Sequence, residues 1–286
     1  MMKIVEYPQR ELWKEISARP QKSAEMIRLR VGEIIDRVVS GGDNALVELT
    51  GELDGVSLDS LFVTEEEIAA ASQFLDEGLK VAIDVAASNI ELFHKAQMPV
   101  EIEVETMPGI KCYQRSFPIN RVGLYIPGGT APLFSTLLML AIPARIAGCA
   151  EIAIFTPPAK DGKVDSSILY VAGKLGITEI VRVGGAQAVA AMAYGTESIK
   201  KVDKIYGPGN SYVAQAKLQV SSNVAIDMVA GPSELMIIAD KTANPSFLAA
   251  DILSQAEHGP DSQLFLLTTD RQIGFDVNVD LERQIK

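Results

Sequence analysis

The stretch RVGLYIPGGT (residues 121–130) decides the fold, because it joins a short apolar run directly to a glycine-rich turn. A helical stretch of small residues follows at 134–147, and a second apolar run, EIAIF, begins at residue 151. A strand, a tight turn and a helix at this spacing form the repeating step of a parallel sheet covered by helices. The stretch therefore predicts an α/β architecture.

The same alternation continues from this stretch towards the end of the chain. It predicts mainly parallel sheets flanked by helices, in Rossmann-like domains. The length of 286 residues favours two such domains. The apolar runs lie at 121–126, 151–155, 179–183, 203–206, 223–229, 234–239 and 263–267, and the helical stretches lie near 134–147, 166–175, 186–194, 211–220 and 246–257.

The N-terminal part has a different, mostly helical pattern. Apolar residues recur at helical spacing over residues 23–47. Thr64 and Glu67 have the spacing of a capping box, which predicts a second helix over 64–95. Alternating polar and apolar residues at 101–115 predict a hairpin or an edge strand.

Charge and composition exclude several classes of partner. The net charge of −11 would repel nucleic acid and anionic membranes, so we expect a small-molecule ligand. The most apolar stretch, at 137–144, is interrupted by Pro143 and is far shorter than the ~20 residues that span a bilayer. The first 15 residues lack the apolar core of a signal peptide. With only Cys112 and Cys149, the chain has no disulfide framework, and we expect a cytoplasmic protein.

Three glycine-rich turns are the first candidates for ligand binding. They lie at 127–130, 184–187 and 207–210, each between an expected strand and an expected helix. The dinucleotide fingerprint G-x-G-x-x-G is absent, so no single turn is diagnostic. A lone turn of this kind usually serves only to reverse the chain. Three of them at the carboxyl edge of one sheet favour a binding site, because glycine lets the backbone approach a phosphate.

A second candidate is the helix expected between the cap at Asn244 and the Gly-Pro stop at 259–260. Asp251, Gln255 and His258 follow one face of it at positions i, i+4 and i+7. An oxygen and an imidazole nitrogen suit Zn²⁺. On spacing alone, however, such a pattern more often marks a solvated face. The other histidine, His94, has no ligand-like neighbours in the sequence and is interpreted as structural.

Four longer strings resemble the histidinol dehydrogenase family. They occur in the family's order and cover most of residues 121–265. The strings are RVGLYIPGGTAPLFSTLLMLAIPARIAGC, VGGAQAVAAMAYGTESIKKVDKIYGPGNSYVAQAK, IDMVAGPSEL and ADILSQAEHGPDSQ.

The resemblance implies roles for particular residues. Tyr125, Gln187 and Asn210, one in or beside each glycine-rich turn, resemble the family's NAD-contacting residues. Ser233 resembles a substrate contact. Gln255 and His258 resemble two zinc ligands that also face the substrate. The resemblance assigns no role to Asp251.

The reaction implied is the oxidation of L-histidinol to L-histidine through L-histidinaldehyde, in two hydride transfers to NAD. Zinc would mainly position the substrate. The family's Glu-His base and its other two zinc ligands have no counterpart before Lys286, so no catalytic residue is assigned, and we expect this chain alone to be inactive.

The resemblance also implies a homodimer and interleaved domains. The expected divisions are an N-terminal helical arm at 1–21, a first, incomplete α/β domain from 22–123 plus 234–286, and a second, NAD-contacting domain at 124–233.

Three alternatives stay open at this point. Cys149 as a thiol nucleophile would make the protein resemble an aldehyde dehydrogenase, although no neighbouring residue in the sequence would activate the thiolate. A paralogue of the same family would oxidise another small polyol or a sulfonated diol. A non-catalytic nucleotide-binding fragment would bind without turnover.

Overall fold

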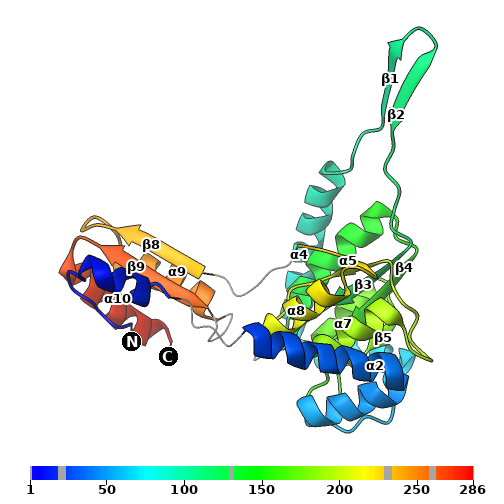
Figure 1. Cartoon of the computed structure of the whole chain (residues 1–286), viewed down its shortest axis with the longest axis horizontal. Coiled ribbons are helices and arrows are strands. Elements are labelled where there is room, and N and C mark those ends of the chain that lie inside the picture. Colours follow the sequence, from blue (N-terminus) through cyan, green and yellow to red (C-terminus); the bar gives the residue numbers. More distant parts are fainter. Residues whose placement is uncertain (1, 19–23, 129–131, 229–233, 258–261, 286) are drawn as a thin grey trace. The chain divides into compact units, whose positions relative to one another are not determined.

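The computed structural model describes the chain except for residues 1, 19–23, 129–131, 229–233, 258–261 and 286 (Figure 1). Contacts divide the chain into two compact units. The larger unit is Glu25–Val229, and the smaller unit combines Met1–Ala24 with Ala230–Lys286. The interleaved domain boundaries expected from the family stay a prediction.

The larger unit is built on a five-stranded parallel sheet of order β5-β4-β3-β6-β7. From β3 the chain adds β4 and β5 on one side, and then returns to place β6 and β7 on the other side of β3. The sheet therefore has a topological switch point between β3 and β6. This arrangement confirms the predicted Rossmann-like α/β class. The strands are β3 (Arg121–Tyr125), β4 (Glu151–Phe155), β5 (Ile180–Val181), β6 (Lys204–Tyr206) and β7 (Ala225–Ile226).

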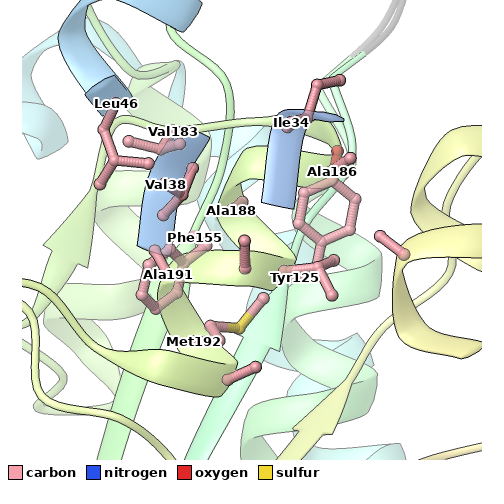
Figure 2. Packing of buried hydrophobic residues seen from close by; sticks show 14 of the residues in the cluster. Ile34, Val38, Leu46, Tyr125, Phe155, Val183, Ala186, Ala188, Ala191 and Met192 are labelled. Carbon is pink, nitrogen blue, oxygen red and sulfur yellow. The ribbon is translucent and has the colours of Figure 1, made fainter. Parts of the chain in front are cut away.

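Helices cover both faces of this sheet, because its central strands bury apolar side chains on both sides (Figure 1). On one face pack α2 (Ala24–Leu53), α7 (Gly185–Tyr194) and α8 (Ser211–Val220). Figure 2 shows part of this core, with Ile34 of α2 and Ala186 of α7 near Tyr125. On the other face pack α4 (Glu77–Ala96), α5 (Phe134–Ala147) and α6 (Ser166–Lys174).

An ion-pair cluster ties the amino ends of the strands together. Arg121, at the start of β3 and 5% exposed, binds Glu151 at 2.6 Å and Glu179 at 2.5 Å. Its backbone N–H donates to Asp203, just before β6, at 2.9 Å. Because the cluster satisfies a charge that is almost fully buried, it fixes this edge of the sheet.

Helix α2 bends sharply at Gly42, whose backbone has φ 54° and ψ −136°. The chain reverses there, so that Arg37 before the bend reaches Glu48 and Glu52 after it. The bend brings the end of α2, at Leu53, back along the sheet.

The single helix predicted over 64–95 is wrong, although its start is confirmed. Thr64 and Glu67 form the expected reciprocal capping box, at 2.9 and 3.2 Å. The segment then divides into α3 (Glu65–Ala70), η2 (Ala71–Phe74) and α4. It divides because Asp76 has an extended backbone and caps a new helix by accepting from the Leu79 N–H at 2.8 Å.

The predicted hairpin at 101–115 is confirmed. Strands β1 (Ile102–Met107) and β2 (Ile110–Gln114) pair antiparallel, and their side chains are exposed throughout. The hairpin projects from the rest of the larger unit (Figure 1).

The smaller unit is a β-α-β-α arrangement with its own core. Strands β8 (Glu234–Ala239) and β9 (Gln263–Thr268) pair in parallel, and α9 (Pro245–Ala256) connects them. A further helix, α10 (Arg271–Gln284), was not identified in the sequence.

The N-terminal segment also belongs to the smaller unit. It contains η1 (Arg10–Leu12) and α1 (Trp13–Ile16). Met2 N–H donates to Asn278 Oδ1 of α10 at 2.9 Å, and Gln263 Nε2 donates to the Ala18 carbonyl at 3.0 Å. Within the described ranges, each helix of the chain is too short or too polar to span a lipid bilayer.

Candidate functional site

The candidate site lies at the carboxyl ends of β3 and β6, on either side of the switch point. Ligands of open α/β sheets bind at this place, because the loops diverge there and leave a crevice. Tyr125 ends β3, and Gly207 follows β6 directly. A Cβ at Gly207 would lie 2.1 Å from the Tyr125 carbonyl oxygen, and its φ is +129°. Only glycine allows this close approach of the two strand ends.

Tyr125 links β3 to the start of α7. Its side chain is buried, and its hydroxyl oxygen accepts a hydrogen bond from the Gly185 N–H at 3.0 Å. Burial raises the pKa of Tyr125 to about 12. The hydroxyl is therefore protonated at neutral pH, and its hydrogen is available for a ligand.

Gln187 lies in the first turn of α7 and is 1% exposed. Its Oε1 is buried and has no hydrogen-bond partner among the described residues. An unpaired buried amide oxygen is costly and uncommon in folded proteins. Gln187 is therefore suited to accept a hydrogen bond from a ligand at this edge.

Asn210 caps the start of α8. Its side-chain oxygen accepts from the N–H groups of Tyr212 and Val213 at 3.0 and 3.2 Å. Asn210 is exposed, and its amide nitrogen makes no hydrogen bond to the residues that the structure describes. One end of the carboxamide therefore holds the helix, and the other end faces no protein partner.

A buried lysine holds the turn after β6, a feature that sequence reasoning missed. Lys217 of α8 donates to the Gly207 carbonyl and to Asp227 Oδ1, the latter at 2.5 Å. Asp227 Oδ2 in turn accepts from the Gly207 N–H at 2.8 Å. The only signal in the sequence is a lysine on the apolar face of a helix, which is rarely buried unless it is paired.

Pro157, after β4, packs against two of the glycine-rich turns. A Cβ at Gly128 would lie 2.5 Å from the proline ring, and a Cβ at Gly184 would lie 2.6 Å from it. The turns after β3 and β5 therefore approach each other here. The rest of the first turn, including Thr130, lies outside the described residues.

The proposed metal and substrate residues are only partly described. Gln255 lies on α9 in the smaller unit, and its Nε2 donates to Ser262 at 3.4 Å, which leaves Oε1 as a possible metal ligand. Asp251 is exposed. Ser233 and His258 lie outside the described residues. No group of three or more His, Cys, Asp or Glu side chains with metal-binding geometry occurs in the part of the chain that is described, so Gln255 alone does not make a zinc site there.

The structure also describes the surroundings of Cys149 and His94. Cys149 is partly buried against the core, and burial raises the pKa of its thiol, which disfavours a thiolate nucleophile. His94, on α4, makes an edge contact with the Phe93 ring at 5.7 Å between ring centroids.

The fold defines a Rossmann-like α/β protein, with a topological switch point between β3 and β6. The family model for histidinol dehydrogenase matches residues 17–286. The chain belongs to the histidinol dehydrogenase family, a family of oxidoreductases.

Relatives and a solved structure agree with this assignment. The chain is similar to histidinol dehydrogenase from Bacteroides thetaiotaomicron, at 52% identity over 100% of this chain and 67% of the relative. It is similar to the Escherichia coli O157:H7 enzyme at 51% identity, over 95% of this chain and 63% of the relative. The crystal structure of histidinol dehydrogenase from Elizabethkingia anophelis superposes with a TM-score of 0.85 at 47% identity, covering 97% of this chain and 64% of that chain. The chain thus spans about two thirds of the length of these proteins.

Proposed function

We propose that this chain carries the nucleotide site and part of the substrate site of an enzyme that oxidises L-histidinol to L-histidine, through L-histidinaldehyde. The proposal rests on one observation above all. In a member of this family, Tyr125 at the end of β3 contacts both the turn that leads to Gln187 and the turn that leads to Asn210, beside the switch point of the sheet.

Each of the three residues has a hydrogen-bonding group that no described residue occupies and that we assign to NAD. The Tyr125 hydroxyl has a hydrogen to donate, Gln187 Oε1 accepts, and the Asn210 amide nitrogen donates. NAD, when bound, supplies the hydride acceptor for both oxidation steps. The residues at this edge bind and orient it.

The substrate and metal roles rest on the family resemblance. We assign Ser233 to the substrate, and Gln255 and His258 to both zinc and substrate. Zinc at these ligands would orient the amino and imidazole groups of histidinol. The resemblance assigns no general base within these 286 residues. We therefore expect the chain alone to be inactive. We also expect the longer enzyme to be a cytoplasmic homodimer.

NADH formation from L-histidinol tests the proposal. We would compare the 286-residue chain with a version extended to the length of its relatives, both supplied with zinc. Activity in the extended protein only is the expected result. Activity in the short chain would contradict the absence of a base. If the extended protein oxidised a sulfonated diol or another polyol but not histidinol, the substrate assignment would be wrong. Failure to bind zinc and to form NADH with any of these alcohols would indicate a non-catalytic protein.

A further inference from the structure

Asp54 lies directly after α2, beside the loop that follows β4. Lys160 of that loop donates a hydrogen bond from Nζ to the Asp54 carbonyl oxygen at 2.9 Å. The loop also packs on the segment after Asp54, since a Cβ at Gly162 would lie 3.7 Å from Val56. The bend in α2 thus places Asp54 at the carboxyl end of β4, the same edge of the sheet as the candidate site.

The described residues satisfy the Asp54 carboxylate only in part, because the charge of Lys160 acts on it while one of its oxygens stays unpaired. Its Oδ2 is buried and makes no hydrogen bond to the described residues, and neither does the buried Thr50 Oγ1, one helical turn earlier. Burial raises the pKa of Asp54, and the Asp54 charge contributes to raising the pKa of Tyr125. The carboxylate is therefore close enough to the candidate site to act on it electrostatically. A buried carboxylate oxygen without a partner destabilises the fold, which points to a role other than stability.

The position beside β4 is where a dinucleotide site of this type needs an acidic residue. In such sheets an Asp or Glu near the end of the second strand binds the ribose hydroxyls of NAD. Here β4 corresponds to that second strand, but it runs into Thr156, Pro157 and Pro158, which carry no acid. Asp54 brings a carboxylate to this end of β4 from a helix outside the strand-helix series.

We propose that Asp54 accepts hydrogen bonds from the adenosine ribose of the bound dinucleotide and so selects NAD over NADP. This inference rests on the proposed function, because it assigns specificity within the same nucleotide site. The 2′-phosphate of NADP would place negative charge beside the Asp54 carboxylate, which disfavours it. Lys160 would be the nearby cation for such a phosphate once the carboxylate charge is removed.

Calorimetric titration of NAD and NADP into the 286-residue chain and its Asp54→Asn variant tests the inference. The variant should bind NAD about tenfold more weakly, or worse, because a hydrogen bond to a charged acceptor is lost. Its preference for NAD over NADP should fall by a similar factor. The melting temperature without nucleotide should be unchanged or higher, since the substitution removes a buried charge. A role in holding the fold would lower it instead.

Two further variants sharpen the result. Asp59→Asn changes an exposed acid a few residues away and should leave both affinities unchanged. If Asp54→Asn binds NADP more tightly than the wild type does, the double variant with Lys160→Ala should lose that gain. If Asp54→Asn binds NAD with the same preference over NADP as the wild type, the role of Asp54 is wrong but the proposed NAD site stands. If the wild-type chain binds neither nucleotide, the proposed NAD site is wrong as well.

Discussion

The Asn210 side chain caps helix α8 with its oxygen and, in our proposal, binds NAD with its nitrogen. One substitution can separate these two roles. Asn210→Asp keeps an oxygen that caps α8, and Asp caps as well as Asn. It loses the amide hydrogens that we assign to NAD and adds a negative charge to the proposed site. We predict that the free energy of unfolding in urea changes by less than about 0.5 kcal/mol. Titration calorimetry should show NAD affinity falling at least about tenfold. A loss of stability with unchanged affinity would show that Asn210 acts only as a cap.

The raised pKa of Asp54 predicts a pH dependence of stability. The unfolded chain ionises Asp54 near its ordinary pKa of 3.8, while the folded chain holds the proton to a higher pH. Above about pH 4 the unfolded state therefore binds fewer protons, and the contribution of Asp54 to stability falls as the pH rises through its folded pKa.

Asp54→Asn removes this titration. Urea unfolding of both proteins at pH 4, 5, 6 and 7 should show the variant gaining stability relative to the wild type as the pH rises, and then levelling off. A constant difference across this range would contradict a raised pKa for Asp54.

At the scale of elements, the bend in α2 depends on Gly42. Its φ is +54°, and a Cβ there would lie 2.1 Å from a carboxylate oxygen of Glu197. We predict that Gly42→Ala destabilises the chain by at least about 2 kcal/mol, from backbone strain and steric overlap. The matched control is Gly51→Ala in the same helix, where the nearest atom to a Cβ would be 3.9 Å away. That substitution should stabilise by about 0.5–1 kcal/mol. Equal effects at the two sites in urea unfolding would exclude a special role for the bend.

The order of strands and helices between residues 121 and 268 could be predicted from the sequence, because each short β-branched run is bounded by a turn signal. The expected helix near 134–147, for example, is α5 with the same bounds. The break at Asp76 was missed, since the apolar spacing continues across it and only the cap marks it. Helix α10 was missed because it is polar overall, although its buried apolar residues Ile273, Val277 and Leu281 recur at helical spacing.

The candidate site could be predicted only where its residues lie in the glycine-rich turns. Tyr125, Gln187 and Asn210 were identified there by the family resemblance. Asp54 and Lys217 were not, because their relation to the turns comes from tertiary packing that sequence spacing does not record. Ser233 and His258 lie outside the described residues, so their roles stay predictions.

At the scale of the whole molecule, the two units differ in the size of their cores. Among the described residues, the smaller unit has a core of six buried residues around a two-stranded sheet, whereas two larger clusters support the five-stranded sheet. Small cores open more readily. Hydrogen exchange followed by mass spectrometry should therefore show β8 and β9 exchanging at least about tenfold faster than β3 and β4. Uniform protection across both units would indicate a single cooperative fold instead.

The Arg121 cluster ties one edge of the main sheet, whereas the opposite edge bears the glycine-rich turns. Substitutions among the turns therefore need not disturb the contacts that anchor the strands. This separation gives the scaffold evolvability: the residues at the glycine-rich edge can change while the ion-paired edge keeps the chain above its folding threshold.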